Sequence, residues 1–186
     1  KGLDRPGIAV SLPRLTRSPQ GAIAGVGQCL LLDTGANVEV KPFTLAQFAV
    51  LGATFARLRT PGSLFKPRVG LLSNGEEASK GTPLLREAHE LLVQSPSPDF
   101  AYVGFVEGRD LFQWQQPGGA GPDGGGGLDV MVTDGFTGNV VLKTAEGAGR
   151  FLAEFLRMQV KRSLLAQLGA LLEDEPVRVP SAQTVA

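Results

Sequence analysis

The fold of this chain is constrained most strongly by four short apolar segments. Each segment is followed at once by a glycine turn that carries acidic or amide side chains. Helical hydrophobic patterns lie between most of these segments, and alternation of strands with helices predicts a mostly parallel sheet covered by helices. The carboxyl ends of parallel strands share one edge of a sheet, and ligands bind at that edge. We therefore expect the four turns to converge there: Asp33-Thr-Gly, Asn74-Gly-Glu-Glu, Glu107-Gly-Arg-Asp and Asp134-Gly-Phe-Thr-Gly-Asn.

The strand predictions rest on apolar runs bounded by turn residues. Pro13 closes the first strand, and the polar residues 14–20 predict a loop. Cys29 lies inside the second strand, so we expect a buried thiol that packs and does not react. The expected strands are 7–12, 26–32, 68–72, 101–106 and 130–132.

Three helices are predicted from apolar residues at helical spacing. The first follows Pro42, and the residues Thr44 to Gln47 have the form of a capping box. The second has Thr82 as its cap and Pro83 at its first position. The third begins near Asn139 with Thr137 as its cap, and is expected to run with one or two breaks to Leu172.

With 186 residues the chain is long enough for one domain with a substantial core. We expect a partial α/β domain over 1–172, in which 140–172 is a long amphipathic helical segment. Residues 173–186 resemble a disordered tail. The chain begins with Lys1 in the middle of a pattern, so we expect it to be a piece of a longer protein.

Composition and missing motifs exclude several classes of protein. Lys plus Arg and Asp plus Glu number 18 each, and no basic stripe is present, so nucleic acid is not an expected partner. No secretory signal or bilayer-spanning run is expected. The dinucleotide, P-loop and serine-hydrolase glycine motifs are missing, and His89 is the only histidine. We therefore predict no metal and no cofactor, and an ordinary half-exposed role for His89.

The remaining polar groups are suited to holding an anion and polarising a carbonyl group. Lys80 is a cation in a glycine-bounded loop, Asn139 is a neutral donor at a helix start, and Lys143 lies one turn further on. A solvated loop lysine and a plain helix-entry residue are equally good interpretations of the first two. The other candidate binding residues are backbone donors and polar side chains of the same turns: Asp33, Asn37, Glu76, Glu77, Asp134, Gly135, Thr137 and Gly138.

Five segments in order resemble the bacterial phosphate acyltransferase family PlsX, over residues from about Arg5 to Leu172. The resemblance implies a three-layer α/β/α sandwich with a mostly parallel sheet, related to isopropylmalate dehydrogenase and phosphotransacetylase. It also implies a reaction of long-chain acyl-acyl carrier protein with inorganic phosphate, which gives acyl phosphate for phospholipid synthesis. The segments are Arg5-Pro-Gly-Ile-Ala, Leu32-Asp-Thr-Gly-Ala-Asn, Val69-Gly-Leu-Leu-Ser-Asn-Gly-Glu-Glu-Ala-Ser-Lys-Gly, Val106-Glu-Gly-Arg-Asp and Asp134-Gly-Phe-Thr-Gly-Asn-Val-Val-Leu-Lys-Thr-Ala-Glu-Gly.

The resemblance carries the family's motif lysine onto Lys80 and its motif asparagine onto Asn139, which we take as the catalytic pair. It further implies a cytoplasmic homodimer attached peripherally to the membrane. Thr34 and the pair Ser73-Asn74 depart from the family pattern, and the glycine run 118–127 resembles an insertion. Glycine and histidine motifs expected before and after this chain are missing. Two alternatives therefore stay open: a phosphotransacetylase-like acyl-CoA enzyme, and a truncated, non-catalytic, membrane-attached scaffold that binds anions.

The last helix combines a broad apolar face with basic residues such as Arg150 and Arg157. Pattern alone favours burial against the sheet or a partner subunit over docking on an anionic membrane. With the resemblance added, we expect the part up to about Phe155 to pack on the core or a dimer partner, and Val160 to Leu172 to contact the membrane. The membrane-contacting residues would be Leu164, Leu165, Leu168 and Leu171.

Overall fold

The computed structural model describes residues 4–17, 22–59, 66–77, 79–113 and 127–162. These belong to two compact units, one that comprises Lys1–Asn139 and one that begins at Val140. The helix α4 (Gly135–Arg162) crosses the boundary between the two units. The predicted tail and the four leucines proposed to contact the membrane lie outside the described residues.

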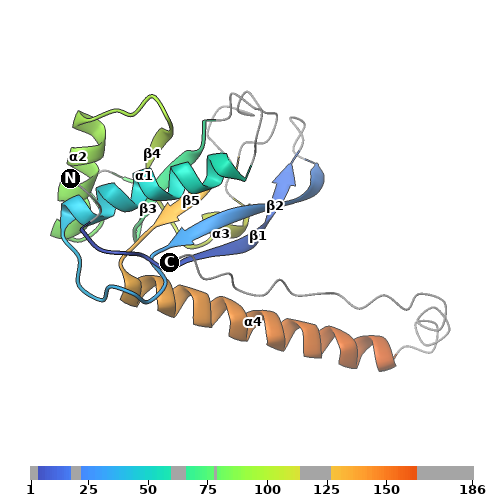
Figure 1. Ribbon diagram of the computed structural model, residues 1–186. Coiled ribbons are helices and arrows are strands. Elements are labelled where there is room, and N and C mark those ends of the chain that lie inside the picture. The colour runs from blue at the N-terminus through green and yellow to red at the C-terminus, as the bar shows by residue number, and fades with distance from the viewer. Residues whose placement is uncertain (1–3, 18–21, 60–65, 78, 114–126, 163–186) are drawn as a thin grey trace. The chain divides into compact units, whose positions relative to one another are not determined.

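A five-stranded sheet forms the first unit, in the order β1-β2-β5-β3-β4 (Figure 1). Strands β2, β5, β3 and β4 are mutually parallel and β1 is antiparallel to β2, so the mostly parallel α/β sheet is confirmed. The bounds are β1 Ala9–Arg17, β2 Ile23–Leu32, β3 Arg68–Leu72, β4 Ala101–Val106 and β5 Val130–Val132.

Strand β1 differs from its prediction. It continues through Pro13 to Arg17, so the predicted polar loop is wrong for residues 14–17. Pro13 lacks a backbone N–H and is tolerated because β1 is an edge strand, with β2 as its single neighbour. In the hairpin of β1 and β2, which the sequence pattern did not reveal, Arg14 is buried and the next residue, Leu15, is exposed.

The helices confirm one predicted cap and correct two others. The bounds in the first unit are α1 Pro42–Leu58, α2 Pro83–Gln94 and α3 Asp110–Gln113. Thr82 caps α2 as predicted, since its Oγ1 accepts from the Leu85 N–H at 3.3 Å. The capping box at Thr44 is wrong, because α1 already begins at Pro42 and Thr44 is buried in its first turn. Helix α4 begins at Gly135, earlier than the Asn139 start that was predicted.

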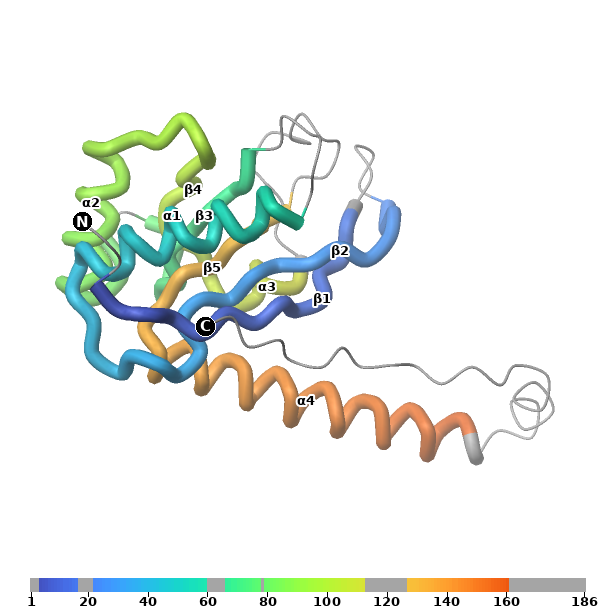
Figure 2. The backbone as a smooth tube through the Cα atoms, in the orientation of Figure 1, coloured from blue at the N-terminus to red at the C-terminus, as the bar shows by residue number. Residues whose placement is uncertain are grey.

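Helices α1 and α2 pack on one face of the sheet, and α1 crosses the strands in Figure 2. Every second strand residue points to this face, which is why Leu30, Leu32, Val130 and Val132 join one apolar cluster with Phe48. The same alternation sends Cys29, Leu31 and Met131 to the opposite face, where α3 contacts β1 and β2.

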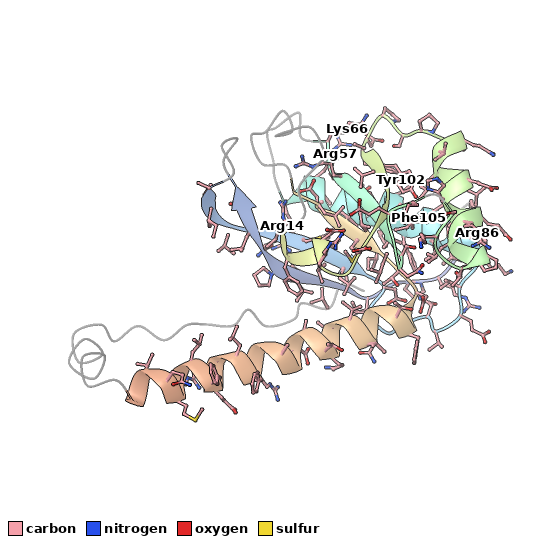
Figure 3. All side chains as sticks on the ribbon, turned by 180° about the vertical axis from the view of Figure 1, so that it is seen from behind. Arg14, Arg57, Lys66, Arg86, Tyr102 and Phe105 are labelled. Atoms are coloured by element: carbon pink, nitrogen blue, oxygen red, sulfur yellow. The ribbon has the colours of Figure 1, made fainter. Side chains whose placement is uncertain are left out.

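Cys29 is fully buried, as predicted, and burial raises the pKa of its thiol, which therefore stays protonated and unreactive. His89 is half-buried on α2, also as predicted, with its Nδ1 2.8 Å from the hydroxyl of Tyr102. The His89 ring also lies against Phe105, with the ring centroids 4.8 Å apart. Figure 3 labels Tyr102 and Phe105 on β4, so His89 joins α2 to that strand.

A buried ion cluster lies at the end of the sheet where the parallel strands begin. Asp129, just before β5, accepts from the backbone N–H of Arg68 at 2.8 Å and lies 3.5 Å from the Nε of the same residue. Arg14 of β1, labelled in Figure 3, places its Nη2 3.4 Å from the other Asp129 oxygen. A buried carboxylate is costly without such partners, so Asp129 holds β1, β3 and β5 together at the edge opposite the four turns.

We predict that Gly52→Ala destabilises the protein. A Cβ atom at Gly52 would lie 2.5 Å from Cγ1 of Val130, so α1 would have to move away from the sheet. Overpacking of this kind lowers the free energy of unfolding by about 1–3 kcal/mol, measurable by urea denaturation. The control is Thr54→Ala on the exposed side of the same helix, expected within about 0.5 kcal/mol of wild type. Equal stability of the two variants would contradict the proposed close packing.

Candidate functional site

The four glycine turns lie along one edge of the sheet, as predicted from their positions after parallel strands. Asp33 follows β2, Asp134 follows β5, Ser73 follows β3 and Glu107 follows β4. Backbone hydrogen bonds join neighbouring turns: the Asp33 N–H donates to the Thr133 carbonyl at 3.1 Å, and the Ser73 N–H donates to the Val106 carbonyl at 2.8 Å.

Asp33 organises the loop after β2. Its Oδ1 accepts from the N–H groups of Ile8, Gly35 and Ala36 at 3.0–3.2 Å. Its Oδ2 accepts from the N–H and the Nδ2 of Asn37, both at 2.8 Å. The carboxylate is fully buried and both oxygens are engaged inside the loop. The structure thus gives Asp33 a part in shaping the site, and direct contact with a substrate stays a prediction.

The same loop is joined closely to the start of α4. Asn37 is buried, its Nδ2 also donates to the Pro6 carbonyl, and its own carbonyl accepts from the Gly135 N–H at 2.7 Å. A Cβ at Gly135 would lie 2.7 Å from that carbonyl, and one at Gly138 would lie 1.8 Å from the Asp33 carbonyl. Both glycines are therefore required where the loop and the helix approach each other.

Asp134, and not Thr137, caps α4. The Oδ1 of Asp134 accepts from the Thr137 N–H at 2.8 Å, and Oδ2 accepts from the Thr137 hydroxyl at 2.7 Å. The prediction that Thr137 is the cap is wrong because the helix begins at Gly135, which places Asp134 in the capping position. The N–H groups of Gly135 and Gly138 donate to protein oxygens as well, so their role as phosphate donors stays a prediction.

Lys80 lies in a compact loop between β3 and α2. The Lys80 N–H donates to the Glu77 carbonyl at 2.8 Å, and the Gly81 N–H donates to Oδ1 of Asn74 at 3.0 Å. A Cβ at Gly75 would lie 2.8 Å from Cγ of Lys80, so the aliphatic part of Lys80 passes close to the glycine backbone. Lys80 is exposed and forms no ion pair with the residues that the structure describes. Its ammonium group is therefore available to an anion.

Three acidic residues of this edge, Glu76, Glu107 and Asp110, lie near one arginine that the sequence pattern did not indicate. Arg109 places Nη2 3.4 Å from Glu76 and 2.9 Å from Glu107. The Glu107 N–H donates to Oδ2 of Asp110 at 2.7 Å, and burial raises the pKa of Asp110. Arg109 stands inside a predicted turn, but nothing in the sequence showed that it would reach the turn after β3.

Asn139 and Lys143 lie on α4 in different units. Asn139 is exposed, and its Cβ and Cγ are 3.9 Å from the Cβ position of Gly35, so it stands beside the Asp33 loop. Lys143 forms an ion pair with Glu146 at 3.0 Å in the second unit. Asn139 and Lys80 follow neighbouring strands, β5 and β3, and no hydrogen bond joins their side chains. The structure brings them to the same edge and leaves both exposed.

The second unit, as described to Arg162, is a single helix with exposed apolar side chains. Phe151 is 70% exposed and its ring stacks on that of Phe155 at a centroid distance of 6.1 Å. Among the helices of the described ranges, none is long and apolar enough to cross a membrane. Within the same ranges no three His, Cys, Asp or Glu side chains are grouped to hold a metal ion.

The fold resembles that of a phosphotransacetylase. The EutD phosphotransacetylase from Staphylococcus aureus superposes with a TM-score of 0.53 over 80% of this chain and 44% of its own, at 22% sequence identity. That likeness shows the fold alone, which is the phosphotransacetylase-like α/β class expected from the sequence.

Sequence comparison is more specific. The family described as "Fatty acid synthesis protein" matches residues 1–183, and this chain belongs to that family. It is 49% identical over 173 residues to a phosphate acyltransferase from Myxococcus xanthus, covering 92% of this chain and 42% of the relative. A phosphate acyltransferase from Rhodospirillum rubrum is 43% identical over 183 residues, covering 98% and 45%. The resemblance to phosphate acyltransferases is confirmed, and the chain spans about two fifths of its relatives' length.

We predict that Asp33→Asn destabilises the first unit. The amide nitrogen of asparagine would face N–H donors that now point at a carboxylate oxygen. Leaving buried donors without acceptors lowers the free energy of unfolding by about 1–3 kcal/mol, measurable by thermal or urea denaturation. Asp99→Asn, at an exposed aspartate, serves as the control and is expected to stay within about 0.5 kcal/mol of wild type. Wild-type stability of Asp33→Asn would contradict the structural role of these hydrogen bonds.

Proposed function

We propose that this chain supplies the phosphate-binding edge of an enzyme that converts long-chain acyl-acyl carrier protein and inorganic phosphate into acyl phosphate for phospholipid synthesis. One observation carries the proposal: Lys80 is exposed and without an ion-pair partner among the described residues, between β3 and α2 and beside the turn that leads to Asn139. Family membership and the names of the relatives support the same reaction.

The proposed chemistry needs no covalent enzyme intermediate. Lys80 binds inorganic phosphate, and a phosphate oxygen attacks the thioester carbon of the acyl carrier protein. Asn139 donates to the carbonyl oxygen as negative charge develops on it, a contribution of about 3–4 kcal/mol per donor in comparable sites. The carbon–sulfur bond then breaks, the thiolate leaves and takes up a proton, and acyl phosphate and free carrier protein are released.

The remaining predicted residues support this site in different ways. Asp33, Asn37 and Asp134 hold the backbone around Asn139 through the hydrogen bonds described above. Glu76 and Glu77 belong to the Lys80 loop, where Glu77 closes the turn through its carbonyl. In this proposal they position Lys80 and Asn139, and the anion itself is held by cationic and neutral donors.

We also propose that the enzyme acts as a cytoplasmic homodimer with peripheral membrane contact. Exposed apolar side chains on α4 support this proposal, because they form a surface that a partner could cover. They are Phe151, Leu152, Phe155, Leu156, Met158 and Val160. A second copy of the chain would cover part of this face, and Leu164, Leu165, Leu168 and Leu171 would meet the membrane. A phosphotransacetylase-like reaction with acyl-CoA is the second candidate, favoured by the fold of EutD.

We predict that Lys80→Met and Asn139→Ala each lower acyl-phosphate formation by about 100-fold or more, because each removes a group that contacts the reacting atoms. The assay is phosphate-dependent release of free carrier protein from palmitoyl-carrier protein. It is run with this chain alone and with the longer protein that contains it. Lys66→Met is the matched control, since Lys66 is exposed before β3, at the opposite edge of the sheet (Figure 3).

The outcomes separate the candidate functions. Near wild-type activity of Lys80→Met would reject its role in catalysis. Phosphate-dependent turnover of palmitoyl-CoA in preference to palmitoyl-carrier protein would establish the second candidate. Phosphate binding without turnover of either substrate by the longer protein would favour a non-catalytic scaffold.

A further inference from the structure

The Lys80 loop is closed by its own contacts. The hydrogen bonds from Lys80 to Glu77 and from Gly81 to Asn74 span the loop, and the side chain of Lys80 passes over Gly75. Because Lys80 and Gly81 are hydrogen-bonded to residues 74–77, the position of the Lys80 ammonium group depends on what holds residues 74–77 to the rest of the edge.

Arg109, in the turn after β4, connects the Lys80 loop to the rest of this edge. Its own turn is anchored, because Asp110 is buried, the Asp110 N–H donates to the Glu107 carbonyl at 2.9 Å, and Leu111 is fully buried in α3. From this base the Arg109 guanidinium reaches Glu76 in the Lys80 loop with Nη2 at 3.4 Å. The same guanidinium lies 2.9 Å from Glu107 and 3.9 Å from Asp110.

We infer that Arg109 is a positioning residue for Lys80: it holds the Lys80 loop to the turn after β4 through Glu76. The inference rests on the proposed function for its kinetic consequence. Arg109 also balances the charge of Glu76, a carboxylate that would otherwise repel a phosphate approaching the same loop. Since Arg109 and Glu76 are 66% and 52% exposed, the effect is that of a solvated ion pair and not of a catalytic group.

The shape of the guanidinium is part of the inference. One nitrogen, Nη2, lies within 4 Å of both Glu76 and Glu107, while Nε faces Asp110. A lysine keeps the positive charge but has a single ammonium group, so it cannot contact Glu76, Glu107 and Asp110 through two separate nitrogen atoms as Arg109 does. Arg109→Lys is therefore expected to restore part of what Arg109→Ala loses.

The first test measures the loop directly by amide hydrogen exchange. In Arg109→Ala the amides of Lys80 and Gly81 are expected to exchange faster than in wild type, because the loop opens more often. The matched control is Arg57→Ala, which removes another exposed ion pair, Arg57 with Asp99 at 2.6 Å, at the opposite edge (Figure 3). Unchanged exchange at Lys80 and Gly81 in Arg109→Ala would overturn the inference.

The second test is kinetic. Arg109→Ala is expected to raise KM for phosphate about two- to five-fold, with kcat and KM for the acyl substrate close to wild type. Glu76→Gln removes the same ion pair and also the carboxylate that would repel phosphate, so the KM of the double variant Arg109→Ala/Glu76→Gln should not exceed that of Arg109→Ala alone. Multiplicative effects of the two substitutions, or an equal rise in KM for Arg57→Ala, would reject the coupling.

The two tests distinguish a failure of this inference from a failure of the proposed function. If wild type forms no acyl phosphate, the proposed function fails, while amide exchange still decides whether Arg109 holds the loop. If wild type is active and neither exchange nor KM for phosphate responds to Arg109→Ala, the inference fails and the proposed function stands.

Discussion

The candidate site depends on one buried carboxylate, that of Asp33. Its two oxygens accept four backbone N–H groups and one side-chain amide, and this fixes the path of the chain after β2. The loop so formed presents the Asn37 carbonyl to Gly135 and leaves room only for glycine at Gly138. The start of α4, and with it Asn139, is therefore placed by hydrogen bonds that converge on a residue below the surface of the site.

Charged side chains have different roles at the two ends of the parallel strands. At the amino ends of the strands, Asp129 is buried with two arginines, and the cluster serves cohesion between strands. At the carboxyl ends Glu76, Lys80 and Arg109 are exposed. Arg109 is shared among three carboxylates, and Lys80 forms no ion pair with the described residues. An exposed cation such as Lys80, without an ion pair in the described part of the chain, can bind an anion at little cost in desolvation, which is why we propose the anion site at this second edge.

Most of the first unit was predictable because its strands are short and apolar and end at turn residues. β3, β4 and β5 have the predicted bounds, and Thr82 caps α2 as expected. The predictions of one strand end and two helix caps were wrong, because residues typical of a boundary stand inside the element. Pro13 marks a strand end in an interior strand but is tolerated on the edge strand β1, and edge position is a property of the sheet. Thr44 and Thr137 resemble caps, yet α1 begins at Pro42 and α4 begins at Gly135 with Asp134 as its cap.

By itself the sequence determined the parallel sheet, the edge at which the glycine turns meet, and the residue types available for anion binding, because hydrophobic period and strand direction follow from local pattern. Only the tertiary structure decided how those residues are used. Asp33 and Asn37 are turned inward onto the backbone, Lys80 is exposed, and Arg109 reaches a turn 33 residues away in sequence. Such pairings depend on which strands are neighbours in the sheet, and spacing along the chain does not encode that order.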